Sequence, residues 1–261
     1  MDGRDGGPPG GNGALRRGPR AMGDRDDHGH PVHPGAIPAD VVERIVRRRG
    51  RAHVFEAFDP VRTALVVIDM QNAFVRAGMG HAHCPAAAGI VPVLNRLAAG
   101  LRSAGGRVAW IRTAHAPGSP QDWSVLYDHL IPLTAGAREE ALTPGSPGHA
   151  LVDELDVDPA DAIVEKYRYS AFLPGASTLP ALLRAEGRDT VMICGTVTNV
   201  CCESSARDAM MLNFKTVMVS DGNAAGDDAT HWASLTTFYS TFGDVLSSRQ
   251  ILGRLASAAA A

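Results

Sequence analysis

Residues 193–204 read ICGTVTNVCCES, and they join a run of apolar residues to a segment with helical spacing. The preceding residues 189–194, DTVMIC, are almost continuously apolar, which is typical of a strand buried on both faces of a parallel sheet. Residues 200–212 show the apolar spacing of a helix. The stretch therefore predicts a strand that leads into a helix, with Cys201 and Cys202 at the junction.

The same change from strand to helix recurs along most of the chain. Short apolar runs predict six strands, at residues 64–69, 107–114, 161–166, 189–194, 215–221 and 244–248. Helical patterns lie between them, at residues 90–106, 178–187, 200–212 and 228–243. Strands that alternate with helices form β-α-β units. We therefore expect a three-layer α/β/α fold, doubly wound and Rossmann-like, with a mostly parallel six-stranded sheet.

Composition divides the chain into three parts. Residues 1–35 are rich in glycine, proline, arginine and aspartate and have almost nothing to bury, which predicts a disordered tail. Residues 36–60 predict an amphipathic helix and a linker, and we expect the helix to lie on the main body or on a partner subunit. Residues 61–255 carry the strand and helix pattern of one folded domain. Within it, residues 116–160 are long and rich in proline and glycine, which is typical of a lid or substrate wall.

The overall composition excludes several functional classes. A formal net charge of −3 gives no reason to expect a polyanionic partner such as a nucleic acid, whose binding proteins usually have a basic face. No apolar run approaches the roughly 18 residues that would span a membrane, and the N-terminus lacks the apolar core of a signal peptide. Four cysteines are too few for a disulfide framework in a chain of 261 residues. We expect a cytoplasmic protein with neither a nucleic-acid nor a membrane partner.

Three residues of different chemistry follow the ends of predicted strands. Asp69 ends the first strand, Lys166 ends the third, and Cys201 comes just after the fourth. Ligands bind at the carboxyl edge of such a sheet, and an acid, a base and a thiol there indicate nucleophilic catalysis. A helix N-terminus would favour the thiolate of Cys201, and Asp69 could accept its proton. Singly, each has another interpretation: Asp69 as a turn cap, Lys166 as a solvated cation, and Cys201 as a small buried residue.

The adjacent Cys202 has a different prediction. It shares a helical face with the small apolar residues Ala206, Ala209 and Met210. Successive helical side chains point about 100° apart, so only one of the two cysteines can face a substrate. We expect Cys201 to react and Cys202 to pack against the sheet.

Metal and cofactor sites are not predicted. His81, His83 and Cys84 lie close together, but no further ligands at suitable spacing complete a tetrahedral site. His115 ends the second strand and could line the site or be structural. The glycine in GTVTN is not part of a dinucleotide-binding glycine motif.

Three motifs together resemble the isochorismatase-like cysteine hydrolases. They are DMQNAF at residues 69–74, EKYRYSAF at 165–172 and GTVTNVCCESSARDA at 195–209. The resemblance extends over residues 63–252, essentially the whole folded domain. Its most specific part is the third motif.

The resemblance implies a set of site residues. It implies a catalytic triad of Asp69, Lys166 and Cys201, and a non-proline cis peptide between Thr196 and Val197. The backbone N–H groups of Val197 and Cys201 would form an oxyanion hole. Substrate-binding residues would include Asn72, Phe74 and Tyr169, with Arg168 as the partner of a substrate carboxylate.

The activity implied is that of a cysteine-dependent amidohydrolase without a cofactor. It would cleave a C–N bond of a small carboxamide or N-carbamoyl (ureido) compound through a thioester. The segments LVDEL and EKYRYSAF look most like the ureidoacrylate amidohydrolases, and relatives are commonly dimers or tetramers. Two alternatives stay open: isochorismatase-type vinyl ether hydrolysis, whose enzymes typically lack the cysteine, and a catalytically silent scaffold of the same fold.

Overall fold

The sheet has six strands, and each pair of neighbours among them is parallel, in the order β3-β2-β1-β4-β5-β6. The computed structural model describes residues 32–55, 57–116 and 122–259. The strands are β1 (Thr63–Ile68), β2 (Arg107–Thr113), β3 (Ala162–Lys166), β4 (Thr190–Thr196), β5 (Lys215–Ala224) and β6 (Asp244–Leu246). The predicted doubly wound α/β fold is confirmed.

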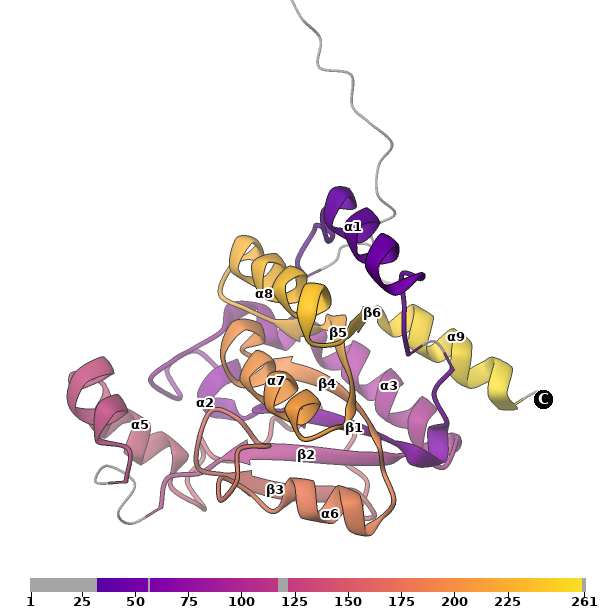
Figure 1. The fold of residues 1–261 in the computed structure, drawn as a ribbon. Coiled ribbons are helices and arrows are strands. Elements are labelled where there is room, and N and C mark those ends of the chain that lie inside the picture. The colour runs from indigo at the N-terminus through magenta and orange to yellow at the C-terminus, as the bar shows by residue number, and fades with distance from the viewer. Residues whose placement is uncertain (1–31, 56, 117–121, 260–261) are drawn as a thin grey trace, which may run out of the picture.

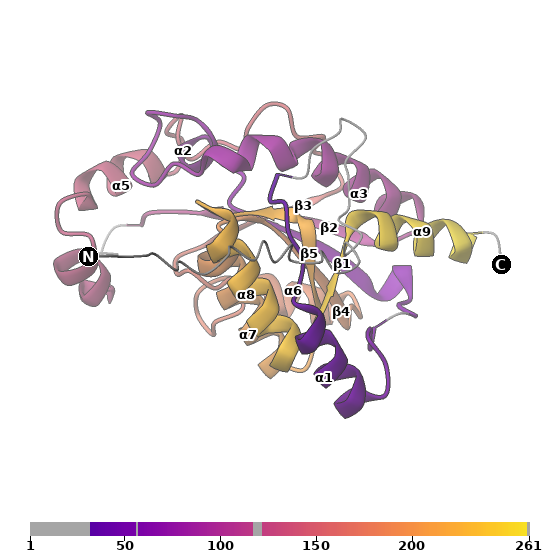
Figure 2. The same cartoon turned by 90° about the horizontal axis from the view of Figure 1, so that it is seen from above.

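Helices cover both faces of this sheet and complete the three layers (Figures 1 and 2). One face carries α1 (Ala39–Arg49), α6 (Leu179–Ala185), α7 (Glu203–Met211) and α8 (Asp228–Thr241). The other carries α3 (Val91–Ser103) and α9 (Ser248–Ala259). Shorter helical segments are η1 (Pro60–Arg62), α2 (Asn72–Val75), η2 (Pro85–Ile90), η3 (Val125–Leu130), α5 (Ala135–Leu142) and η4 (Thr198–Cys202).

The central strand β1 shows why the strand sequences are continuously apolar. Ala64, Val66 and Ile68 pack into the core beneath α6, α7 and α8. Leu65 and Val67 point the other way, into the core beneath α3 and α9. Because successive side chains alternate between two covered faces, no position in the strand is left for a polar residue facing solvent.

Several boundaries differ from the sequence prediction. The helix expected over residues 200–212 begins as a single turn of π-helix, η4, before α7 starts at Glu203. Strand β5 runs on to Ala224, where Asn223 Nδ2 donates to the carbonyls of Ile193 and Val219 at 3.0 and 2.7 Å. Strand β6 stops at Leu246, because Asp221 Oδ1 accepts the Ser248 amide at 2.7 Å and helix α9 begins there. Helix α9 was not predicted from the sequence.

The helix predicted near the N-terminus packs on the main body. Val41 and Ile45 of α1 are buried in the core beside α8, and Gly50 ends the helix in a left-handed conformation. The linker after it is held by the buried Asp244, whose Oδ2 accepts the backbone N–H of Val54 at 2.9 Å. Most of the predicted tail, residues 1–31, lies outside the described part of the chain.

Residues 32–35 pack on the body although the sequence analysis assigned them to the tail. His33 is 7% exposed. Its Nδ1 lies 2.7 Å from Asp228 Oδ1, and its Nε2 accepts the Ala225 amide at 3.0 Å. Its ring stacks on His231, and His231 Nδ1 contacts Thr198 Oγ1 at 2.9 Å. The N-terminal segment therefore supports the turn η4.

Within residues 32–55, 57–116 and 122–259, no helix has both the length and the apolar character needed to cross a membrane.

Candidate active site

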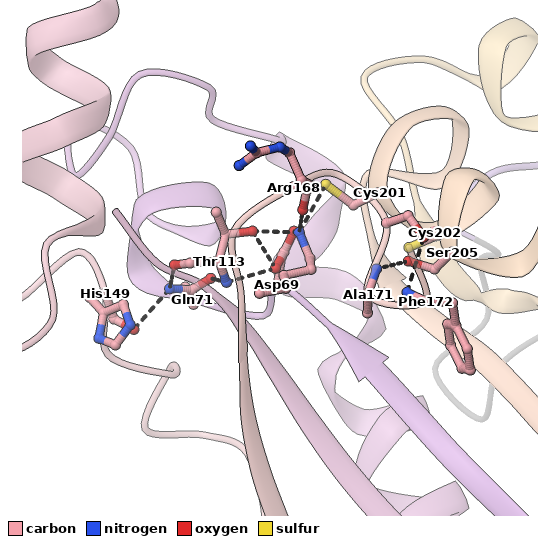
Figure 3. Close-up of polar contacts among 12 residues, drawn as sticks. Asp69, Gln71, Thr113, His149, Arg168, Ala171, Phe172, Cys201, Cys202 and Ser205 are labelled. Atoms are coloured by element: carbon pink, nitrogen blue, oxygen red, sulfur yellow. Dashed lines mark hydrogen bonds and ion pairs between the residues drawn. The ribbon is translucent and has the colours of Figure 1, made fainter. Parts of the chain in front are cut away.

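Three strand ends and one turn bring the predicted triad together. Asp69 follows β1, Thr113 and Lys166 are the last residues of β2 and β3, and Cys201 lies in η4 after β4. The strands are neighbours in the order β3-β2-β1-β4 and are parallel, so their carboxyl ends share one edge. Residues far apart in the sequence therefore meet in one buried cluster (Figure 3).

The Asp69 carboxylate is held by the neighbouring strand. Its Oδ1 accepts hydrogen bonds from the Thr113 amide at 3.1 Å and from Thr113 Oγ1 at 2.9 Å. The Asp69 backbone has a φ of 53°, a left-handed conformation, and its N–H donates to the Ile111 carbonyl at 2.9 Å. Its other oxygen, Oδ2, lies 2.9 Å from Lys166 Nζ as an ion pair but accepts no regular hydrogen bond among the described residues.

Lys166 is a fully buried ammonium surrounded by acceptors. Its Nζ donates to Thr113 Oγ1 at 2.5 Å, to the Arg168 carbonyl at 3.1 Å and to Cys201 Sγ at 3.5 Å. Burial alone would lower the pKa of Lys166, but the charge of the Asp69 carboxylate, and after it the influence of Cys201, outweigh burial and raise that pKa. The side chain is therefore a fixed cation.

Cys201 is a protonated thiol in this environment. Burial raises its pKa to about 12; Lys166 opposes the rise, whereas Asp69 adds to it. The expectation that the helix N-terminus favours the thiolate is wrong for the free enzyme, because the loss of solvation outweighs the positive charges around the sulfur.

The two adjacent cysteines point in different directions (Figure 3). Cys201 Sγ faces Lys166. Cys202 is fully buried in the core beneath α7, and its Sγ lies 3.9 Å from the Cys194 carbonyl oxygen. Cys202 is therefore a packing residue, as its helical face indicated.

Glycine is required where β4 approaches β1. A Cβ atom at Gly195 would lie 2.1 Å from the Ile68 carbonyl oxygen, and Gly195 has a φ of 113°. The next peptide bond, between Thr196 and Val197, is cis. The Val197 carbonyl accepts the amides of Val200 and Cys202 at 3.0 and 3.3 Å, so Val197 and Cys201 belong to one tight turn.

Gln71 and Thr113 were missed by the sequence analysis. Gln71 is fully buried; its Oε1 accepts the Thr113 amide at 2.8 Å, and its Nε2 donates to the carbonyls of Thr113 and His149 at 3.0 Å each. Gln71 therefore fixes the end of β2 against the Asp69 loop. Two sequence features could have indicated that these residues belong to the site: Thr113 lies at the end of a predicted strand, and Gln71 comes two residues after Asp69.

Asn72 and Phe74 lie on the short helix α2. Asn72 Nδ2 donates to the Pro147 carbonyl at 3.0 Å, which ties α2 to the long segment before β3. The Phe74 ring is buried, with the His81 ring 5.9 Å away edge-on. Neither contacts the triad through a hydrogen bond.

Arg168 and Tyr169 follow Lys166 directly. The Arg168 guanidinium donates to the carbonyls of Tyr167 and Asp122 at 2.9 and 3.1 Å and lies 5.2 Å from the Trp123 ring centre. In Figure 3 this guanidinium points away from Asp69 and Cys201. The Tyr169 ring packs edge-on against Trp123, with centres 4.9 Å apart.

Two histidines singled out from the sequence, His81 of the weighed metal site and His115 at the end of the second strand, have other contacts. His81 Nε2 lies 3.1 Å from Arg138 Nη1, and burial followed by the Arg138 charge lowers the pKa of His81 to about 4. His115 Nδ1 contacts the Tyr127 hydroxyl at 3.3 Å. In the described part of the chain, no group of three or more His, Cys, Asp or Glu side chains could hold a metal ion.

Known proteins share both the sequence and the fold. Residues 63–250 match the model of the isochorismatase domain. A ureidoacrylate amidohydrolase RutB of Methylobacterium radiotolerans is 33% identical over 219 residues, covering 76% of this chain and 82% of the relative. The structure of a cysteine hydrolase from Pseudomonas syringae is 32% identical, with a TM-score of 0.69 over 77% of this chain and 95% of the other. An N-carbamoylsarcosine amidase from Thermoplasma acidophilum is 27% identical, with a TM-score of 0.58 and coverage of 72% and 96%.

Proposed function

The chain belongs to the isochorismatase family, and we propose that it is a cysteine-dependent amidohydrolase that cleaves a C–N bond of a small carboxamide or ureido compound. The observation that carries the proposal is the buried cluster of Asp69, Lys166 and Cys201, with the lysine ammonium within 3.5 Å of both the carboxylate and the sulfur. The similarity to a ureidoacrylate amidohydrolase and to an N-carbamoylsarcosine amidase supports the bond type.

In the first step Asp69 acts as a general base. A thiol with a pKa of about 12 is a weak nucleophile at neutral pH, so its proton must leave as the sulfur attacks. The Asp69 carboxylate, paired through Oδ2 with Lys166 at 2.9 Å, acts directly on the Cys201 thiol and can take this proton. The Cys201 Sγ bond to the substrate carbonyl carbon then forms while Asp69 becomes neutral.

Lys166 keeps its proton throughout the reaction. It orients the Asp69 carboxylate, and its charge offsets the negative charge that passes from Asp69 to the sulfur. The oxyanion of the tetrahedral intermediate would be held by the backbone N–H groups of Val197 and Cys201. Removing one donor from such a hole typically costs about 10²–10³ in rate.

The remaining steps return the enzyme to its starting state. The intermediate breaks its C–N bond, and Asp69 gives its proton to the leaving nitrogen. The product on the enzyme is an acyl or carbamoyl thioester of Cys201. Asp69 then removes a proton from water, which attacks the thioester, and the sulfur leaves with that proton as the thiol.

The substrate that the relatives suggest is ureidoacrylate or a similar small ureido acid. Phe74, Tyr169 and Asn72 are proposed as walls of its site. Arg168 is proposed to contribute through its carbonyl, which already holds Lys166 at 3.1 Å.

Ammonia release from a panel of small amides tests the proposal. The panel contains ureidoacrylate, N-carbamoyl amino acids, maleamate, biuret and nicotinamide, together with a vinyl ether substrate. We expect the wild type to release ammonia and Cys201→Ala to be at least about 10⁴-fold slower. Cys202→Ala is the matched control, because it removes the neighbouring thiol from the core and should keep its activity.

Three results would count against this function. Ammonia release that survives Cys201→Ala would remove the thiol from the mechanism. Cleavage of the vinyl ether alone would identify the isochorismatase-type reaction, and no turnover of any compound would favour a silent scaffold.

We also propose that the chain forms a homo-oligomer, a dimer or a tetramer. Support comes from three apolar side chains in and after η3 that are exposed to solvent: Val125 at 62%, Leu130 at 68% and Leu133 at 98%. Exposed apolar patches mark interaction surfaces. Light scattering should give two or four times the chain mass of 27.4 kDa. Leu133→Asp should reduce the measured mass to that of a single chain. Met211→Asp, the same kind of change at an exposed site on α7, should leave the mass of the oligomer unchanged.

A cytoplasmic location is proposed as well. It is supported by four cysteines that are all free and buried, which suits a reducing compartment. Cell fractionation that finds the protein outside the cytoplasm would contradict it.

A further inference from the structure

Arg138, on helix α5, is a buried cation without a carboxylate partner among the described residues. Arg138 is only 5% exposed. No ion pair among the described residues involves its guanidinium. Nη1 contacts His81 Nε2 at 3.1 Å, and Nε has no hydrogen-bond partner in this part of the chain. A buried charge without a counterion is costly, so this guanidinium is suited to receive an anion.

The residues around Arg138 are those proposed as the substrate site. Its guanidinium lies 5.9 Å from the Trp123 ring centre. Trp123 packs on Tyr169 at 4.9 Å, and His81 packs on Phe74 at 5.9 Å. Arg138 therefore joins the two aromatic walls, one from α2 and one that follows Lys166.

The positive charge also reaches the reacting groups. Burial raises the pKa values of both Cys201 and Tyr169, and the charge of Arg138 opposes the rise at each. The pKa of His81 is about 4, because of burial and then of Arg138 itself, so that ring is neutral at pH 7. The guanidinium is consequently the single charge of the Arg138–His81 pair.

Arg168, the arginine assigned from sequence, is less suited to bind an anion. Both of its terminal nitrogens already donate to backbone carbonyls, those of Tyr167 and Asp122. It lies over the same Trp123 ring as Arg138. Of the two arginines beside Trp123, Arg138 is the one with a buried nitrogen, Nε, that has no hydrogen-bond partner among the described residues.

We propose that Arg138 binds a carboxylate of the substrate, so that the enzyme selects small amides or ureido compounds that are also carboxylic acids. This assignment rests on the proposed function. With Nη1 occupied by His81, the edge formed by Nε and Nη2 remains, and a guanidinium edge matches the two oxygens of a carboxylate. Arg138 would act as a specificity-determining residue, fixing the substrate while Cys201 attacks its carbonyl.

A pair of substrates separates this role from a structural one. Ammonia release is measured with ureidoacrylate and with its methyl ester, which lacks the charge. We expect Arg138→Gln to lower kcat/KM for the acid by 100-fold or more, mainly through KM, and for the ester by less than threefold. Arg138→Lys should recover about tenfold on the acid, because the charge returns without the planar fork.

Arg168→Gln is the matched comparison, since it removes the other cation from the same tryptophan. Arg168→Gln should change kcat/KM for the acid and for the ester by the same factor. A selective loss on the acid with Arg168→Gln, or an equal loss on both compounds with Arg138→Gln, would overturn the assignment. Thermal denaturation of each variant checks that it is folded. If Arg138→Gln does not fold, the comparison of acid and ester is made with Arg138→Lys instead.

Binding without turnover distinguishes this inference from the proposed function. In the Cys201→Ala background, calorimetry should show that ureidoacrylate binds and that Arg138→Gln weakens it at least 30-fold. If the wild type releases no ammonia but this difference is found, the activity is wrong and the carboxylate site is right. If ureidoacrylate does not bind, or if Arg138→Gln leaves its affinity unchanged, the carboxylate site is refuted whatever the activity.

Discussion

Thr113 links the two charged members of the candidate triad. Its hydroxyl donates to Asp69 Oδ1 at 2.9 Å and accepts from Lys166 Nζ at 2.5 Å. A hydroxyl can do both at once, since it has one donor and two lone pairs. Thr113 therefore sets how the carboxylate faces the thiol, although it does not react.

Thr113→Val should test that positioning role. The substitution keeps the shape of the side chain but leaves Asp69 Oδ1 with the backbone N–H alone, so we expect kcat to fall about 10- to 100-fold, within the range of general-base contributions. Thr216→Val is the control. Thr216 is also buried, and its hydroxyl donates to the Phe214 carbonyl at 3.0 Å. It lies near the start of β5, at the amino ends of the strands and so away from the candidate site.

Each of the two threonine substitutions should cost about 1–2 kcal/mol of unfolding free energy, but only Thr113→Val should slow the reaction. Steady-state kinetics and urea unfolding measure the two effects. Equal kinetic losses in both variants would show that the effect comes from general destabilisation.

Strand β4 and the turn η4 depend on one close approach. The backbone of Gly195 meets the carbonyl of Ile68 at a distance that excludes any side chain. The sheet register between β4 and β5 also shifts between Ile193 and Gly195. The strand can therefore turn into η4 and carry Cys201 toward Lys166.

Gly195→Ala should be strongly destabilising. The clash with Ile68 and the φ of 113° both oppose a Cβ atom, and we expect a loss of about 3–5 kcal/mol. In contrast, Gly253→Ala lies in helix α9, where a Cβ atom would have nothing within 4 Å, and should gain up to about 1 kcal/mol from helix propensity. Denaturant midpoints of the two variants compare these outcomes, and a tolerated Gly195→Ala would contradict the proposed close packing.

For the whole molecule, buried thiols make stability depend on alkaline pH. Burial raises the pKa of Cys201 to about 12 and also raises those of Cys194 and Cys202. In the unfolded chain a thiol titrates near 8.5. Because the native state holds these protons more tightly, stability is complete below about pH 8.5 and is lost as the pH rises toward the native values.

Urea unfolding between pH 7.5 and 10.5 measures this dependence. Each thiol should contribute a slope of up to about 1.4 kcal/mol per pH unit above pH 8.5. Cys202→Ala should remove one such contribution and flatten the curve by that amount. A wild-type stability that is level across this range would be inconsistent with three protonated buried thiols.

The sequence by itself determined the order of strands and helices, the parallel sheet and the three residues that follow strand ends. These properties are local, since an unbroken apolar run such as residues 64–68 must be covered on both faces. It did not predict helix α9, the π-turn that carries Cys201 or the packing of His33 against His231.

Only the tertiary structure decided the protonation of the site and the residues that surround the triad. The raised pKa of Cys201 follows from its burial, which no local pattern reports. The roles of Thr113, Gln71 and Arg138 depend on contacts between segments 42 to 57 residues apart. Such contacts arise when strands and helices assemble, because their geometry is set by packing between distant segments.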